Sequence, residues 1–271
     1  MSAQTPIAFI GGGNMAASLI GGLVDAGWRP DQLVVAEPDA DRRADLAARF
    51  QVRTTADNAE AAREAATVVL AVKPQVMETV ALALGPILRE ARPLVISVAA
   101  GIPLARLGAW LGMGSPLVRV MPNTPALVGA GISALYPDAE ASAEHRDTAQ
   151  AIMQAGGEVV WVAKEEHMDI VTAVSGSGPA YFFLILEALE EAAVAEGLDR
   201  ETARTLAVHT AGGAAALARE TGDPSAVLKS RVTSPGGTTA RGLEALERGG
   251  VRTALADAVA AAARRSRELG G

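Results

Sequence analysis

Cysteine is absent from the 271 residues of this chain. Its absence excludes a disulfide scaffold, a thiolate metal site and a cysteine nucleophile. Histidine is scarce too, because only His145, His167 and His209 occur, and they lie far apart in the sequence. Zinc ligands are usually grouped at short, regular spacings. The sequence therefore predicts no metal site and no chemistry that depends on a thiol.

Aromatic residues make up only 3% of the chain, and no block of basic residues is present. The formal net charge is −7 with acids and bases interspersed, so nucleic acid is not an expected partner. Apolar residues make up 49%, which is enough to build a substantial core. We see no signal peptide and no run of about 20 apolar residues that would cross a membrane. We expect a cytoplasmic protein that does not contact a membrane.

Short apolar segments alternate with helical patterns over the first half of the chain. Buried strands are predicted at residues 6–10, 33–36, 67–72, 93–98 and 117–121. A last, hairpin-like pair of strands is predicted at 132–136 and 158–162, separated by a helix over 139–155. Strands that alternate with helices in this way form a doubly wound α/β sheet.

A glycine-rich turn follows the first predicted strand. Gly11 and Gly13 take the first two glycine positions of the dinucleotide fingerprint, and Ala16 takes the third. Gly11 permits a tight turn, and Gly13 lets the backbone approach a pyrophosphate at the start of a helix. Because the motif lies directly between a strand and a helix, it predicts a bound dinucleotide.

Glu37 ends the second predicted strand, and an acid at this point usually accepts a hydrogen bond from the ribose 2′-hydroxyl of NAD. Arg42 and Arg43 follow shortly, and they would instead reach the 2′-phosphate of NADP. The alternative is that both arginines lie on the solvated face of the next helix. The residues by themselves leave the choice between NADH and NADPH open.

Two further segments are predicted at strand ends. Lys73 and Pro74 follow the strand 67–72, where α/β sheets hold their ligands. The uncharged loop 122–131 suits a wall over the nicotinamide. The alternatives are that Lys73 is an ordinary surface lysine and that the loop 122–131 is a simple connector.

The second half of the chain reads as helices only. They are predicted at 164–173, 179–196, 200–220, 224–230, 235–248 and 251–268. The helix 179–196 begins with two turns that are apolar on every side, so their surface must be covered all round. We expect a two-fold homo-oligomeric interface there, unless this helix is central to its own domain.

The stretch Ser234–Thr239 is predicted to open the helix 235–248, with Ser234 as its cap and Pro235 in its first turn. Gly236 and Gly237 would then carry an entropic cost inside the helix. A helix start without side chains is useful where a small anion contacts backbone N–H groups. An ordinary capped helix start is the alternative.

Five stretches of this chain resemble pyrroline-5-carboxylate reductases, and the similarity covers nearly the whole sequence. They are Ile10–Met15, Ala71–Gln75, Val118–Pro125, Ser175–Tyr181 and Ser234–Thr239. The first is common to many dinucleotide-binding proteins, whereas the last three in this order are highly specific.

This resemblance implies a Rossmann-type domain over residues 1–163, an all-helical dimerisation domain over 164–271, and an active site in the cleft between them. It implies the final step of proline biosynthesis, in which NADPH or NADH reduces 1-pyrroline-5-carboxylate to L-proline. It also implies a homodimer, which in some members builds a decamer.

The resemblance places the functional residues as well. Cofactor contacts are expected at Gly11, Gly13, Asn14, Met15, Glu37, Asn58, Ala71, Val72, Lys73, Pro74, Ala99 and Asn123. Substrate contacts are expected at Glu165, Ser175, Ser234, Gly236, Gly237, Thr238 and Thr239, with Glu166 as the alternative to Glu165.

Thr239 is the expected catalytic residue. No acid/base pair is evident near the motifs, and a substrate that enters as the iminium needs only a hydrogen-bond partner for its ring N–H. The Thr239 hydroxyl would be that partner, while the N–H groups of Gly236, Gly237 and Thr238 hold the substrate carboxylate.

Two other functions fit parts of the sequence. A two-domain dehydrogenase of small β-hydroxyacids would share the architecture, but it normally carries a catalytic lysine on a helix after the domain junction. Lys164 is the only lysine nearby, and it precedes the helix. A dinucleotide-binding protein without catalysis would not need Ser234–Thr239 intact.

Overall fold

The computed structural model of the protein describes residues 5–112 and 114–270, and the chain divides into two compact units. The first unit is Met1–Ser177 together with Ala261–Gly271, and the second is Gly178–Ala260. The domain boundary predicted after residue 163 stays a prediction.

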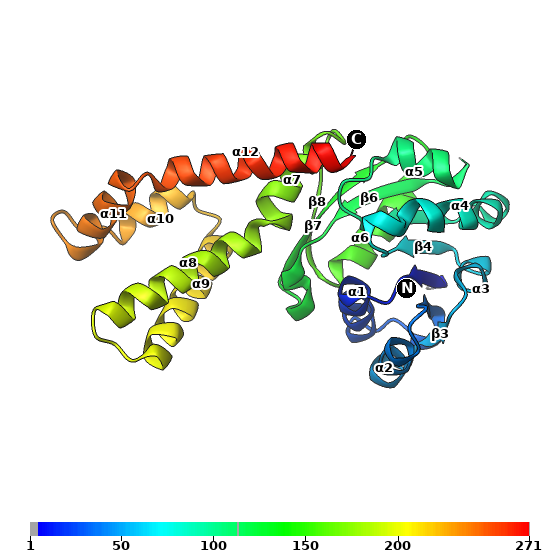
Figure 1. The fold of residues 1–271 in the computed structure, drawn as a ribbon, viewed down its shortest axis with the longest axis horizontal. Coiled ribbons are helices and arrows are strands. Elements are labelled where there is room, and N and C mark those ends of the chain that lie inside the picture. The colour runs from blue at the N-terminus through cyan, green and yellow to red at the C-terminus, as the bar shows by residue number, and fades with distance from the viewer. Residues whose placement is uncertain (1–4, 113, 271) are drawn as a thin grey trace. The chain divides into compact units, whose positions relative to one another are not determined.

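An eight-stranded sheet forms the centre of the first unit, in the order β3-β2-β1-β4-β5-β6-β7-β8 (Figure 1). The strands are β1 (Ile7–Ile10), β2 (Leu33–Ala36), β3 (Arg53–Thr55), β4 (Thr67–Leu70), β5 (Leu94–Ser97), β6 (Leu117–Met121), β7 (Gly131–Pro137) and β8 (Gly157–Trp161). Neighbouring strands from β3 to β6 run parallel. Every residue of β1, β4 and β5 is buried, which explains why these strands are continuous apolar runs in the sequence.

The last two strands correct one prediction. β7 runs antiparallel to β6, but β8 runs parallel to β7. The helix α6 (Ala143–Gln154) connects them. The predicted hairpin-like pair was therefore wrong, because parallel neighbours need a crossover connection and the intervening helix provides it.

Helices cover both faces of the sheet and enclose two cores. One core takes buried residues from α1 (Asn14–Asp25), α2 (Ala40–Phe50) and α6, and the other takes them from α3 (Asn58–Arg63), α4 (Pro74–Ala91) and α5 (Leu104–Leu111). Because side chains alternate along a strand, Ile7 and Phe9 of β1 face the first core while Ala8 and Ile10 face the second. This arrangement confirms the doubly wound α/β sheet.

The first unit contains further short elements. They are the 3-10 helices η1 (Pro30–Gln32) and η2 (Thr124–Val128), the helix α7 (His167–Val171) and the π-helical turn η3 (Thr172–Gly176). The last turns of α12 (Val251–Gly270) also belong to it. Ser266 of α12 donates a hydrogen bond to Oδ1 of Asp169 at 2.6 Å, which fixes these turns against α7.

The second unit is helical in its described residues, as predicted. It consists of α8 (Gly178–Ala195), α9 (Arg200–Thr221), α10 (Ser225–Arg231), α11 (Thr238–Arg248) and the first turns of α12. Figure 1 shows α8 and α9 side by side as a helical hairpin. Phe182 is 65% exposed, and Phe183 and Leu184 are each 64% exposed. A helix central to its own domain would bury such residues, so that alternative was wrong.

The segment His167–Ala195 corrects another expectation. Among the described residues it forms one helical stretch that is long and apolar enough to cross a membrane by length and composition. The statement that no such run exists was therefore wrong. The stretch includes the exposed face of α8, which the sequence analysis assigned to an oligomeric interface.

The start of α11 also differs from the prediction, because the helix begins at Thr238 with Gly237 as its N-cap. Gly237 N–H donates to the Ser234 carbonyl at 3.1 Å, and Gly236 has a φ of +72°. Proline followed by a left-handed glycine is the signature of a type II turn. Ser234 therefore starts a turn and does not cap the helix, and the two glycines precede the first helical turn.

A partly buried ion pair ties three parts of the first unit together. Oε1 of Glu165 accepts hydrogen bonds from Leu104 N–H at 2.7 Å and from Arg119 Nη1 at 3.0 Å. The side chain of Arg119 is 7% exposed and that of Glu165 is 26% exposed. Glu165 thus joins the start of α5 and the strand β6 to the segment that leads into α7.

We predict that Glu165→Gln lowers the free energy of unfolding by about 1–3 kcal/mol, because it leaves the Arg119 guanidinium buried without its counter-charge. Chemical unfolding followed by tryptophan fluorescence measures the change in free energy. All variants are compared at one protein concentration, because the apparent stability of any protein that self-associates depends on its concentration.

The matched control is Glu166→Gln. Glu166 pairs with Lys164 at 3.4 Å, with side chains 71% and 67% exposed. Breaking a surface pair of this kind costs less than about 1 kcal/mol. Equal effects of the two substitutions would contradict the role given to Glu165.

Candidate active site

The sheet has a topological switch point between β1 and β4. The two strands are neighbours, yet the chain leaves β1 towards β2 and β3 and returns to β4 afterwards. In open α/β sheets, ligands bind beyond the carboxyl ends of the strands at such a point. Gly11 follows β1 and Ala71 follows β4, so the predicted glycine motif and the predicted lysine segment meet there.

The two segments touch through backbone atoms. Gly11 has a φ of +99°, and a Cβ added to it would lie 2.8 Å from the carbonyl oxygen of Ala71. Gly11 N–H donates to the Ala36 carbonyl, and Ala71 N–H donates to the Ile10 carbonyl, each at 2.8 Å. Only glycine therefore fits the first position of the motif without strain.

Gly13 serves a different purpose, because it is the N-cap of α1 and no described atom lies within 4 Å of a Cβ added to it. Among the described residues, no side chain caps this helix, whereas Asp39 caps α2 and Asp57 caps α3. The first N–H groups of α1 therefore face open space at the switch point. This geometry fits the pyrophosphate of a dinucleotide.

The other predicted cofactor residues surround this point. They follow the carboxyl ends of successive strands or lie in the first turn of the next helix: Asn14, Met15, Glu37, Asn58, Ala71, Val72, Lys73, Pro74, Ala99 and Asn123. The structure thus brings the whole predicted cofactor group to one edge of one sheet. The contact of each residue with a cofactor stays a prediction.

Glu37 has contacts that the sequence analysis missed. Its Oε2 accepts a hydrogen bond from Gly12 N–H at 2.8 Å, and its Oε1 accepts one from Asp39 N–H at 3.1 Å. A Cβ added to Gly12 would lie 2.7 Å from Leu46 Cδ1 and 3.1 Å from Glu37 Cβ. Gly12, which lies between the motif glycines Gly11 and Gly13, therefore has to be a glycine, because any side chain there would collide with Glu37 and with Leu46 of α2.

Arg42 and Arg43 take different positions. Nη1 of Arg43 donates to the carbonyl oxygens of Glu37 at 2.7 Å and Pro38 at 2.9 Å. Arg43 thus lies against the end of β2, while Arg42 is exposed on α2. The predicted placement on the solvated face of a helix fits Arg42 and does not fit Arg43.

Ser175 joins the same edge of the sheet through Asn123. Nδ2 of Asn123 donates to the Ser175 carbonyl at 3.2 Å, and its Oδ1 accepts from Ile132 N–H at 2.9 Å. A Cβ on Gly176 would meet Met121 Cε, so η3 packs closely on the end of β6. Short π-helical turns often occur at functional sites, and no sequence signal used above predicts one.

Of the two adjacent glutamates, Glu165 is the one that faces the protein interior. Its carboxylate binds Arg119 and Leu104, whereas Glu166 is exposed beside Lys164. A substrate contact of Glu165 stays a prediction.

The stretch Ser234–Thr239 lies in the second unit. Gly237 N–H donates to the Ser234 carbonyl within the turn. This N–H group is therefore already hydrogen-bonded, whereas the sequence analysis expected it to hold an anion. Among the described residues, no side chain caps α11, so the N–H groups of its first turn at Thr238 and Thr239 have no capping partner. Their contact with a substrate stays a prediction.

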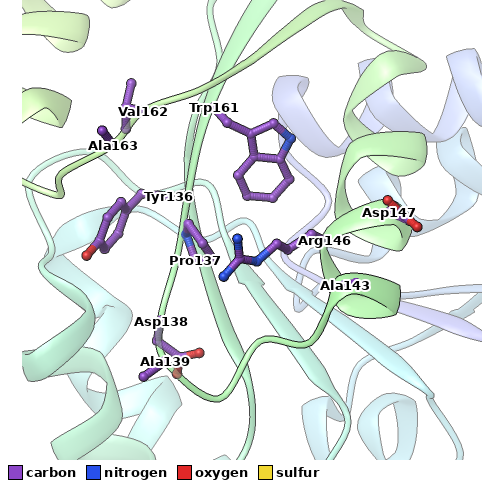
Figure 2. A pocket seen from close by; sticks show the side chains of 10 residues that line it. All are labelled: Tyr136, Pro137, Asp138, Ala139, Ala143, Arg146, Asp147, Trp161, Val162 and Ala163. Atoms are coloured by element: carbon purple, nitrogen blue, oxygen red, sulfur yellow. The ribbon is translucent and has the colours of Figure 1, made fainter.

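A cavity of about 600 Å³ lies elsewhere in the first unit (Figure 2). Figure 2 shows Arg146 pointing from α6 towards Pro137 at the end of β7. Because β7 runs antiparallel to β6, Pro137 pairs with Val118 at the amino end of β6. Partial burial raises the pKa of Asp138 in its wall. The cavity is therefore at the sheet edge opposite the predicted site, and it contains none of the predicted residues.

Two family models match this chain. The model for pyrroline-5-carboxylate reductase dimerisation matches residues 165–269. The model for NADP oxidoreductase, coenzyme F420-dependent, matches residues 6–101, which include the glycine motif and the switch point.

Relatives match over nearly the full length. A pyrroline-5-carboxylate reductase of Pseudomonas aeruginosa is 48% identical over 267 residues, covering 98% of this chain and 97% of that protein. One of Synechocystis sp. is 45% identical over 274 residues, covering 100% of this chain and 99% of that protein.

Solved structures are similar as well. A pyrroline-5-carboxylate reductase from Coxiella burnetii has a TM-score of 0.95 and 42% identity, covering 99% of this chain and all (100%) of that one. A Plasmodium falciparum pyrroline carboxylate reductase with NADP bound has a TM-score of 0.88 and 31% identity, covering 99% of each chain. The chain belongs to the pyrroline-5-carboxylate reductase family.

Proposed function

We propose that this protein is an NAD(P)H-dependent oxidoreductase that reduces 1-pyrroline-5-carboxylate to L-proline, the final step of proline biosynthesis. The observation that carries the proposal is the uncapped glycine loop at the switch point, in a chain that belongs to this family. The function predicted first from the sequence is thus the one that the comparisons favour over its alternatives.

The first unit binds the dinucleotide. The N–H groups at the start of α1 hold the pyrophosphate, and Glu37 lies where the ribose next to the adenine is bound. Bound NAD(P)H supplies the hydride that reduces the imine carbon. Lys73 and Pro74, after β4, and Ala99, after β5, complete the wall of the site. The protein's own contribution is to orient the two reactants and to exclude water.

The turn and first helical residues of Ser234–Thr239 bind the substrate. Its carboxylate is held by the uncapped N–H groups at the start of α11, where the helix dipole adds about 0.3–1 kcal/mol. The Thr239 hydroxyl accepts a hydrogen bond from the ring N–H of the iminium. Gly236 permits the left-handed turn that keeps side chains away from this anion site.

The β-hydroxyacid dehydrogenase alternative is weakened by Lys164. Its side chain is 67% exposed, and its ammonium group pairs with the exposed Glu166. A lysine in this environment is an ordinary surface residue. Initial rates on pyrroline-5-carboxylate, with a small β-hydroxyacid as the competing substrate, distinguish the two functions, and nicotinamide binding without any turnover would favour a non-catalytic protein.

The protein is an oligomer, as its dimerisation-family match over residues 165–269 indicates. We propose that the exposed apolar residues of α8 are covered by a second copy across a two-fold axis, and that dimers in turn build a decamer. Glu187, Glu190 and Glu191 on α8 suit a water-facing assembly better than lipid. A cytoplasmic location without membrane contact is part of the same proposal.

We expect Thr239→Val to lower kcat/KM for pyrroline-5-carboxylate about 10²-fold, because it removes the hydrogen-bond partner of the reacting nitrogen and keeps the side-chain volume. Steady-state kinetics at saturating cofactor measures the change, and KM for the cofactor should stay the same.

Thr233→Val is the matched control, because the Thr233 hydroxyl donates to the Lys229 carbonyl at 2.6 Å and has no proposed contact with substrate. Unchanged efficiency of the Thr239 variant, or an equal loss in both variants, would sink the role proposed for Thr239.

We expect Phe182→Glu to dissociate the oligomer, because Phe182 is 65% exposed in the single chain and the proposed interface would bury the new carboxylate away from water without a partner. Size-exclusion chromatography with light scattering measures the molar mass. Leu82→Glu on α4 of the first unit, where Leu82 is 55% exposed, is the control and should keep the wild-type mass. A wild-type monomer, or a Phe182 variant of unchanged mass, would refute the assignment.

A further inference from the structure

We infer that the cavity at the carboxyl ends of β7 and β8 binds a free amino acid with an apolar side chain, whose carboxylate contacts Arg146 and whose ammonium group contacts Asp138. This second site lies at the sheet edge opposite the cofactor edge. The inference does not depend on the proposed reaction, because its ligand is neither the substrate nor the cofactor at the active site.

The cavity lies where a pair of parallel strands ends. β7 runs antiparallel to β6, and β8 runs parallel to β7 after the connection through α6. The carboxyl ends of this pair therefore lie at the edge opposite those of β1 and β4. Residues at both strand ends line the cavity, Tyr136–Ala139 after β7 and Trp161–Ala163 after β8. Open α/β sheets bind ligands beyond the carboxyl ends of their strands, and about 600 Å³ is a volume typical of small-molecule sites.

Arg146 is the cation of this cavity. It lies in the first turn of α6, and its Nε donates to the Ala141 carbonyl at 3.3 Å, which orients the guanidinium. Within the part of the chain that the structure describes, its Nη atoms have no hydrogen-bond or ion-pair partner. The N–H groups of α6 do not compete for an anion, because the Ser142 side chain already caps this helix. A guanidinium with free donors suits a carboxylate, which it binds through two parallel N–H groups.

Asp138 is an anion in the wall of the same cavity. Its Oδ1 accepts hydrogen bonds from Ala141 N–H at 2.9 Å and from Glu140 N–H at 3.1 Å, which hold the carboxylate just beyond the end of β7. None of the described residues forms an ion pair with it, and partial burial raises its pKa. A partly buried carboxylate without a counter-charge is stabilised in its charged form by a cation that arrives with the ligand.

These two charges face one cavity without pairing with each other. In the view of Figure 2, the guanidinium of Arg146 lies between Trp161 and Asp138. Opposite charges that pair satisfy one another, whereas Arg146 and Asp138 each keep hydrogen-bonding capacity for a ligand. A zwitterion supplies both missing partners, and a ligand with one charge supplies only one of them.

Trp161 provides an apolar surface beside the charges. Its Nε1 donates to Oε1 of Gln150 at 2.8 Å, which fixes the plane of the indole, and the side chain is half-buried. Pro137 and Val162 extend this apolar wall. Aromatic rings pack favourably on one another in stacked or edge-to-face arrangements. We therefore use L-phenylalanine as the probe for an amino acid with an apolar side chain.

Titration of the full-length protein, followed by tryptophan fluorescence, tests the site. 3-Phenylpropanoate lacks the ammonium group of L-phenylalanine, and 2-phenylethylamine lacks its carboxylate. We expect a Kd of about 0.1–1 mM for L-phenylalanine and at least about tenfold weaker binding of each analogue. Saturating NAD⁺ or NADP⁺ should leave the Kd unchanged, because the dinucleotide is bound at the opposite edge of the sheet. Equal affinity for the three compounds, competition with the dinucleotide, or no measurable binding overturns the inference.

Two substitutions separate the two charges. Arg146→Gln should weaken binding of L-phenylalanine at least about tenfold and leave 2-phenylethylamine unchanged. Asp138→Asn keeps the oxygen that accepts the hydrogen bonds from Glu140 and Ala141, but it removes the charge. It should weaken binding of L-phenylalanine about tenfold and should not weaken binding of 3-phenylpropanoate. An equal loss for every compound in both variants would indicate damage to the cavity and would overturn the inference.

Arg63→Gln is the matched control for Arg146→Gln, because Arg63 is exposed in the last turn of α3, does not line the cavity and carries the same charge. It should change the Kd of L-phenylalanine by less than about twofold. Arg146→Lys, which keeps the positive charge, should retain most of the affinity, and dinucleotide binding by each variant confirms that the first unit is folded. A lysine variant as weak as the glutamine variant, or an equal effect of Arg63→Gln, would contradict the role given to Arg146.

Discussion

The close approach of two backbone segments at the switch point is the constraint on which the rest of the structure depends. Gly11 and Ala71 follow neighbouring parallel strands, and a Cβ on Gly11 would lie 2.8 Å from the Ala71 carbonyl. This contact sets how tightly the chain turns from β1 into α1. The uncapped end of α1 then points towards the open edge of the sheet, where an anion is stabilised by free N–H groups.

A second layer of contacts surrounds this turn and links it to more distant parts of the first unit. Glu37, which follows β2, accepts a hydrogen bond from Gly12 N–H in the glycine turn. Asn123 joins the end of β6 to the carbonyl of Ser175, and Glu165 joins β6 and α5 to the segment before α7. The predicted cofactor edge is therefore braced by hydrogen bonds between residues up to 61 positions apart in the sequence.

The second unit differs from the first in how little of its apolar surface it buries. Its helices bury little apolar surface within one chain, and α8 leaves both phenylalanines exposed. Surface of this kind is stable in water only when another surface covers it, which agrees with the match to a dimerisation family. The turn before α11 belongs to this unit, so the proposed substrate site lies in the same part of the chain as this exposed apolar surface.

The sequence by itself determined the features that depend on near neighbours in the chain. The glycine spacing at Gly11 and Gly13, the alternation of strands and helices, and the helical second half could all be predicted from local patterns. Only the tertiary structure decided the parallel pairing of β7 and β8, the turn that replaces the Ser234 cap, and the contacts that separate Glu165 from Glu166 and Arg43 from Arg42. Those depend on which distant residues pack together, and a local pattern carries no information on that.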